Sequence, residues 1–196
     1  EKRIAEEKRI AEEKRIAEEK RIAEEKRIAE EKKKAEALDS SKNAQAQFIK
    51  IVQTASLNGK YNEVEMEKIL NKRNKDLVKL INNNEINSWV ANIDKIKTYD
   101  EKIFVSVLIE SNTLKKAIYF ETFDDPSLDI LYETMIELPD LLYEKLSEIE
   151  PNNKVLISGS FFINNKGFFE QKNFFKRNML EKPVFLFKFT KIEKIE

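Results

Sequence analysis

The sequence predicts an α+β protein in three parts: a long charged helix, a short helical neck, and a domain of five strands. A helix is expected between the third and fourth strands. The unit EKRIAE repeats five times from Glu1, and apolar residues then recur at helical spacing as far as Ile81. From Ile86 onward apolar and polar residues alternate, which is typical of strands. We expect the parts to cover residues 1–37, 38–85 and 86–196.

The repeat predicts a helix because it lacks Gly, Pro and Ser and consists mainly of strong helix formers. At about 100° per residue, a step of six places Ile4, Ile10 and Ile16 about 120° apart around the axis. No heptad seam forms, so a simple coiled coil is not expected. Pairs such as Lys2 with Glu6 support the helix at i,i+4 spacing. The repeat therefore predicts a rigid spacer, or a helix packed among several neighbours.

The neck is predicted to contain two helices. Asp39-Ser40-Ser41 indicates a break in the helix and a new N-cap, followed by a helix over residues 42–57. Asn58-Gly59 is a typical C-terminal stop. A second helix is predicted over residues 64–81.

The C-terminal domain is predicted to hold five strands. Trp89 belongs to the first strand, where we expect a core position; stacking against a ligand is the alternative. A helical stretch is expected over 127–149, kinked or restarted at Pro139, and Gly159 marks a bulge or sharp bend. The expected strands cover residues 86–98, 103–109, 114–123, 154–163 and 184–192.

Two segments carry a resemblance to a known fold family. KVLISGSFF at Lys154–Phe162 and PVFLFKFTKI at Pro183–Ile192 are similar to strands of uncharacterised bacterial OB-fold-like domains. The order of three strands, a helix and two strands resembles the same family, over about residues 86–193. This resemblance implies a five-stranded OB-like β-barrel. OB-folds bind nucleic acids, sugars, peptides or proteins, and the resemblance implies no catalytic residues.

Composition argues against several classes of function. The chain has no Cys and no His, so the commonest general base and the thiolate nucleophile are missing, and we expect no enzyme activity and no cofactor. The 36 basic and 36 acidic residues balance, and no apolar run is long enough for a membrane segment. The chain starts at Glu1 and not at Met, so we expect a fragment or a processed protein. A cytoplasmic location is slightly favoured, and an upstream anchor would instead indicate the bacterial envelope.

The densest acidic cluster contains Asp124, Asp125 and Asp129. Such carboxylates could bind Ca²⁺ or Mg²⁺, but their spacing matches no EF-hand loop. We expect them to cap the helix that follows, and we expect no metal site.

The best binding candidate is the segment KGFFEQKNFFKRN at residues 166–178, between the fourth and fifth expected strands. It interleaves two Phe pairs with basic side chains. Its candidate binding residues are Lys166, Phe168, Phe169, Lys172, Phe174, Phe175, Lys176 and Arg177. Three interpretations remain open: an interface with a protein partner or with another copy of the chain, core packing alone, or stacking of single-stranded nucleic acid.

The charge of the C-terminal domain is split along the sequence. Residues 151–196 hold 9 basic and 4 acidic side chains, whereas residues 89–150 hold 6 basic and 14 acidic side chains. A domain with two oppositely charged parts suits head-to-tail protein contacts as well as it suits a basic groove. The net charge of residues 89–196, with 15 basic and 18 acidic side chains, argues against nucleic acid. The sequence therefore predicts a non-catalytic interaction protein, an OB-like domain carried on a charged helix within a larger assembly. A single-stranded nucleic-acid-binding domain is the alternative.

Overall fold

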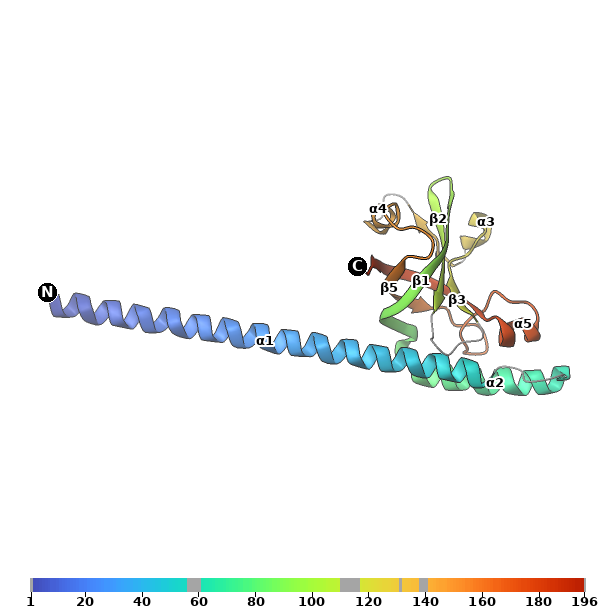
Figure 1. Ribbon diagram of the computed structural model, residues 1–196, viewed down its shortest axis with the longest axis horizontal. Coiled ribbons are helices and arrows are strands. Elements are labelled where there is room, and N and C mark those ends of the chain that lie inside the picture. Colours follow the sequence, from blue (N-terminus) through green and yellow to red (C-terminus); the bar gives the residue numbers. More distant parts are fainter. Residues whose placement is uncertain (1, 56–60, 110–116, 131, 138–140, 196) are drawn as a thin grey trace. The chain divides into compact units, whose positions relative to one another are not determined.

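The computed structural model describes residues 2–55, 61–109, 117–130, 132–137 and 141–195, with the side chains of residues 2–14 and of Leu128 excepted (Figure 1). The chain divides into two compact units, Glu1–Ser40 and Ser41–Glu196. Three expected features lie outside the described residues: the stop at Asn58-Gly59, the start of the third strand at 114–116, and Pro139.

The charged repeat belongs to a single helix, α1, which covers Lys2–Thr54. The break expected at Asp39-Ser40-Ser41 is therefore wrong. Strong helix formers flank these three residues on both sides, and each of the three lowers helix stability by only about 0.5 kcal/mol. The Ser41 hydroxyl also donates to the Asn87 carbonyl instead of capping a new helix.

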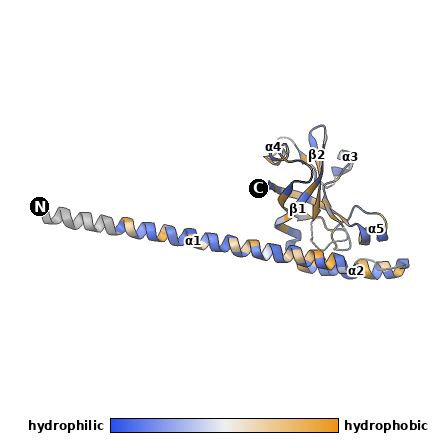
Figure 2. Ribbon diagram, viewed as in Figure 1, coloured by the Kyte–Doolittle hydropathy of each residue, from blue (hydrophilic) through white to orange (hydrophobic). Residues whose placement is uncertain are grey.

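In the first unit, the described side chains of α1 follow the expected pattern. Ile16, Ile22 and Ile28 are 42%, 43% and 54% exposed within the chain. Figure 2 shows hydrophobic residues as separate orange turns on a mostly blue helix. Ion pairs join neighbouring turns, at 2.7 Å for Arg21–Glu18. These pairs support the helix without a continuous apolar stripe.

In the part of the chain that the structure describes, six strands form one mixed sheet. They are β1 (Glu85–Tyr99), β2 (Lys102–Ile109), β3 (Ile118–Glu121), β4 (Ile136–Glu137), β5 (Lys154–Phe161) and β6 (Val184–Lys194). The strand order is β1-β5-β6-β3-β2-β4, and β1 also pairs with β2. That extra pairing closes five of the strands into a ring. Every pairing is antiparallel except β3 with β6, which is parallel.

The expected α+β class and the expected helical connection after the third strand are confirmed. The connection is not, however, the helical stretch that was expected over residues 127–149. It consists of α3 (Pro126–Asp129) and α4 (Leu141–Leu146), with β4 between them. Asp129 explains the interruption. Its buried carboxylate accepts hydrogen bonds from the backbone N–H groups of Thr134 at 2.7 Å and Met135 at 3.1 Å. These bonds turn the chain toward β4 instead of continuing the helix.

Among its described residues, the second unit has three further helical segments: α2 (Glu63–Leu80), the 3-10 turn η1 (Asn82–Asn84) and α5 (Lys176–Glu181). The second neck helix was predicted, and it begins with a capping box between Asn62 and Glu65. The sequence did not predict α5, whose N-cap residue Phe175 provides no side-chain cap. A six-residue helix with no cap leaves almost no sequence signal.

The last turns of α1 supply part of the core. Phe48 is fully buried, and its ring centroid lies 5.2 Å from that of Trp89, 5.7 Å from that of Phe120 and 5.5 Å from that of Phe185. Trp89 is 1% exposed, as expected for a core residue. The segment of α1 that follows Ser41 therefore packs directly on the strand ring.

Gln45 connects the same segment to a strand backbone. Its side-chain Nε2 donates to the Val90 carbonyl at 2.6 Å, and its Oε1 accepts from the Val90 N–H at 2.9 Å. A primary amide thus pairs with β1 as a neighbouring strand would. This pairing satisfies two backbone groups next to Trp89.

Gly159 permits the close approach of β5 and β6. A Cβ atom at this position would lie 2.1 Å from the Lys188 carbonyl oxygen and 2.6 Å from a ring carbon of Phe187. The Lys188 carbonyl belongs to the backbone of β6, so it cannot move aside without disturbing the strand pairing.

We expect Gly159→Ala to lower the free energy of unfolding by about 3 kcal/mol, because the added methyl group overpacks the junction of two strands. Gly167→Ala is the matched control. Gly167 has a φ of 75°, and no described atom lies within 4 Å of the position that an added methyl group would take. Only the cost of a left-handed backbone applies there, about 1 kcal/mol. Urea unfolding monitored by Trp89 fluorescence measures both, and equal losses would contradict the role assigned to Gly159.

Candidate partner-binding surface

The segment between β5 and β6 folds back on the sheet through backbone hydrogen bonds. The Asn164 side chain accepts from the backbone N–H groups of Lys166 at 3.0 Å and Phe168 at 3.1 Å, which forms a tight turn at Gly167. Glu170 then donates to the Phe162 carbonyl and accepts from the Leu186 N–H. The segment is therefore an ordered ragged hairpin that extends the sheet beside the start of β6.

The two Phe pairs of the candidate segment have different environments. Phe169 is 2% exposed and stacks on Phe161, with ring centroids 4.4 Å apart. Phe168 is half-buried. Phe174 and Phe175, in contrast, are 94% and 73% exposed. The first pair thus contributes to the core, and the second pair is presented to solvent.

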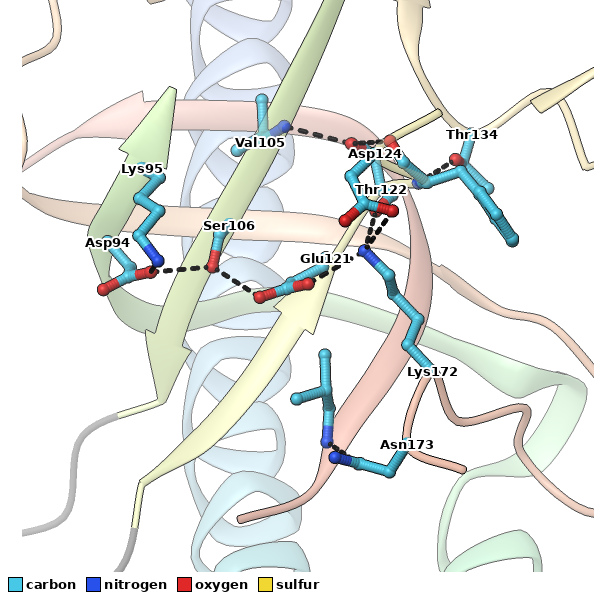
Figure 3. Close-up of polar contacts among 12 residues, drawn as sticks. Asp94, Lys95, Val105, Ser106, Glu121, Thr122, Asp124, Thr134, Lys172 and Asn173 are labelled. Carbon is cyan, nitrogen blue, oxygen red and sulfur yellow. Dashed lines mark hydrogen bonds and ion pairs between the residues drawn. The ribbon is translucent and has the colours of Figure 1, made fainter. Parts of the chain in front are cut away.

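Lys172 is held by acidic groups of the sheet (Figure 3). Its side chain is 14% exposed, and its ammonium lies 3.0 Å from Glu121 and 3.3 Å from Asp124. It also donates to the Thr122 carbonyl at 3.1 Å. This cation is fully engaged within the protein, so it fixes the segment on β3.

Aromatic rings complete the environment of Lys172. Its ammonium lies 5.1 Å from the ring centroid of Phe104 and 5.8 Å from that of Phe123. The negative faces of these rings favour a nearby cation. Phe104 is only 4% exposed. It alternates along β2 with residues whose side chains fill the inside of the ring of strands, so its own side chain lies on the outer face of β2. The segment therefore covers part of the outer face of β2.

The polar contacts continue from Lys172 across three strands (Figure 3). The hydroxyl of Ser106, which is completely buried, lies 3.1 Å from a carboxylate oxygen of Glu121 and 3.1 Å from one of Asp94. Its single proton can be donated to either. Glu121 therefore links Ser106 on β2 to Lys172.

Two of the three remaining cations of the candidate segment, Lys176 and Arg177, also have acidic partners. The Lys176 ammonium lies 3.0 Å from Glu67 and 3.2 Å from Glu63, both on α2. The hydrogen bond from Lys176 lowers the pKa of Glu67, and the same bond raises the pKa of Lys176. Arg177 pairs with Glu181 at 3.1 Å within α5. Lys166, at the tip of the turn, is exposed.

The helices α2 and α5 support the exposed Phe pair through a small apolar cluster. Met66 and Leu70 of α2 are each 5% exposed and pack with Leu180 of α5, which is 1% exposed. Phe174 and Phe175 immediately precede α5 and therefore have a fixed base. Two adjacent aromatic side chains held outward in this way are typical of contacts with an apolar pocket in another molecule.

The acidic cluster of the sequence is divided among structural roles. Asp125 accepts from the backbone N–H of Ser127 at 2.9 Å and so caps the start of α3. Asp124 pairs with Lys172, and Asp129 binds the turn before β4. In the part of the chain that the structure describes, no three acidic side chains come together as a metal site would require.

The carboxylates that neutralise the candidate segment could not be identified from the sequence. Glu63, Glu67 and Glu121 are distant from it in sequence, and only the folding of α2 and β3 brings them to Lys172 and Lys176. No local pattern indicates such pairs, because each of these glutamates lies in an ordinary amphipathic element.

Comparison with known proteins adds no family assignment: the chain matches no protein-family model and no curated protein sequence. Over the described residues, every helix is too short or too polar to cross a bilayer.

We expect Lys172→Ala to lower the free energy of unfolding by about 2 kcal/mol. The substitution removes hydrogen bonds to charged groups and leaves Glu121 without its ammonium partner. Lys166→Ala, on the exposed tip of the same segment, should change the free energy of unfolding by less than about 0.5 kcal/mol. Urea denaturation gives both values. A loss no larger for Lys172→Ala than for Lys166→Ala would show that Lys172 does not hold the segment.

The pair of Lys176 and Glu67 predicts a pH-dependent contribution to stability. Because the pKa of Glu67 is lowered below its ordinary value of 4.5, the contribution is present above pH 4.5 and is lost as the pH falls through the lowered pKa. Carboxyl NMR titration should show the pKa of Glu67 returning toward 4.5 in Lys176→Gln. An unchanged titration in that variant would refute the assigned cause.

Proposed function

We propose that this chain is a non-catalytic interaction protein. The strand ring serves as a binding domain carried on the charged helix, and the whole chain belongs to a larger assembly. The partner is a protein, or another copy of the chain. The absence of Cys and His from the sequence supports a binding role over catalysis.

One observation carries the proposal. Phe174 and Phe175 are 94% and 73% exposed, on a segment whose cations Lys172, Lys176 and Arg177 each have a carboxylate partner. Burial of a Phe side chain contributes about 1.5–3 kcal/mol, so the pair offers a partner substantial binding energy. A phosphate backbone would instead have to displace the existing carboxylates before it reached these three cations.

We further propose that the strand ring is an OB-like barrel. The supporting observations are the closure of β1 on β2, the parallel pairing of β3 with β6, and the helical connection between β3 and β5. In OB-folds, the face of the second and third strands and the loop before the last strand commonly bind ligands. The segment with Phe174 and Phe175 is that loop.

Single-stranded nucleic acid is the second candidate ligand. The observation in its favour is the combination of exposed aromatic rings with basic side chains, including Lys182, whose ammonium lies 4.9 Å from the ring centroid of Tyr119. Stacking on Phe174 and Phe175 would be insensitive to base sequence. The neutralised cations favour a protein partner over this alternative.

Site-specific photocrosslinking tests the proposal. A benzophenone amino acid replaces Phe174 in one variant and Leu141 in a control variant, because Leu141 is a 78% exposed apolar residue on α4. In the cells that produce the protein, we expect one discrete protein adduct from position 174 and not from position 141. An adduct of twice the 23.1 kDa chain mass would indicate self-assembly. Identical adducts from both positions, or none from position 174, would contradict the proposal.

Oligonucleotide binding distinguishes the two candidate functions. By fluorescence anisotropy with a labelled oligothymidine at physiological salt, we expect a Kd weaker than about 10⁻⁴ M, the weak end of the range for non-specific binding. A tighter Kd that weakens with salt, and that is lost in Phe174→Ala/Phe175→Ala, would support the nucleic-acid alternative instead.

A further inference from the structure

A groove lies between the last turns of α1 and the middle of α2, within the second unit. It has a volume of about 360 Å³, which is near the lower end of the range for small-molecule sites. Its apolar wall contains Ile51, Ala55 and Ile69, and its charged groups are Lys50, Lys72, Arg73 and Asp76. None of these residues belongs to the segment that carries Phe174 and Phe175.

Arg73 is unusual among the charged residues that line the groove, because it is only 2% exposed. Its Nε and one terminal nitrogen donate to the Asn74 side-chain oxygen at 3.1 and 2.9 Å, and the other terminal nitrogen donates to the Met179 carbonyl at 2.5 Å. Both acceptors are neutral. Among the described residues, no carboxylate forms an ion pair with this guanidinium. Lys172, Lys176 and Arg177 of the candidate segment, in contrast, each pair with a carboxylate.

A buried guanidinium without a counter-ion is costly, because neutral acceptors replace only part of its hydration. Burial lowers the pKa of Arg73 to about 10, so the side chain still carries its charge at neutral pH. The ring of Phe185, 5.7 Å from the guanidinium carbon, compensates only weakly. A negatively charged group in the adjoining groove would supply the missing counter-charge.

The rest of the groove indicates which anion would fit. Exposed Lys50 and Lys72 leave an excess of positive charge over the one carboxylate of Asp76. That carboxylate disfavours a doubly charged phosphate more than a singly charged carboxylate. The wall of Ile51, Ala55 and Ile69 suits an apolar body.

We propose that this groove binds a small organic acid, with its carboxylate directed toward Arg73 and its hydrocarbon part against the wall formed by Ile51, Ala55 and Ile69. The site extends the function beyond partner binding. It joins α1 to α2, so a bound acid would stabilise the packing of these helices by mass action.

Octanoate is the probe, and octan-1-ol is the neutral analogue of equal chain length. Titration of the full chain by ¹H–¹⁵N NMR should give saturable shifts for residues of the groove with octanoate. The affinity for octan-1-ol should be at least tenfold weaker, since it offers no negative charge to Arg73. Equal affinity for the two, or no saturable shift with octanoate, would overturn the proposal.

Substitutions of opposite sign provide the decisive comparison. Lys72→Gln should weaken octanoate binding and Asp76→Asn should strengthen it, each by about two- to fivefold, the effect of one exposed charge. A gain of affinity in Asp76→Asn cannot arise from loss of folding. Arg73→Gln should weaken binding at least tenfold; if it does not fold, the two other variants decide the outcome. Lys191→Gln, on β6, is the control and should have no effect. If neither Lys72→Gln nor Asp76→Asn changes the affinity for octanoate, octanoate binds elsewhere and the proposal is overturned.

Discussion

Phe48 contacts an aromatic side chain from four of the five ring strands: Trp89 on β1, Phe120 on β3, Phe161 on β5 and Phe185 on β6. A ring of five strands needs side chains to fill its interior, and here a helix outside the sheet supplies one of them. Because Phe48 belongs to α1, the end of that helix is part of the core of the second unit. Gln45 reinforces the attachment by pairing with the backbone of Val90.

The other features follow from this attachment. Leu77 of α2 and Ile81, the C-cap residue that follows it, belong to the same core cluster as Phe48, and the groove with Arg73 lies between α1 and α2. Arg73 and the pair of Glu63 and Glu67 on α2 then bind α5, through the Met179 carbonyl and Lys176. The exposed Phe174 and Phe175 are thus positioned by contacts that lead back to the core. Under the proposed function, a partner of this pair would meet a prearranged surface, which would reduce the entropy cost of association.

Much of the fold could be predicted from sequence, because periodicity reports local burial. The charged helix, α2, the long strands and the core position of Trp89 all follow from spacing. Three features could not be predicted in this way. Helix α1 continues through Asp39-Ser40-Ser41 because these residues lower helix stability only slightly and Ser41 donates to the Asn87 carbonyl instead of capping. Asp129 interrupts a helical pattern by binding a later turn, and α5 lacks a side-chain cap. For the candidate site, the sequence identified the segment but not which Phe pair is buried, since the two have the same local pattern.

The unfolding free energy of Phe48→Ala, measured by urea denaturation of the full chain, tests whether the end of α1 is part of the core of the second unit. Loss of a buried Phe from the core should cost about 3–5 kcal/mol, and Trp89 fluorescence and helical circular dichroism of the second unit should change together in one transition. Ile28→Ala, at an exposed position on the same helix, is the control and should change stability by less than about 0.5 kcal/mol. A loss below about 1 kcal/mol for Phe48→Ala, with the Trp89 transition unchanged, would show that the strand ring is stable without α1 and would contradict the account.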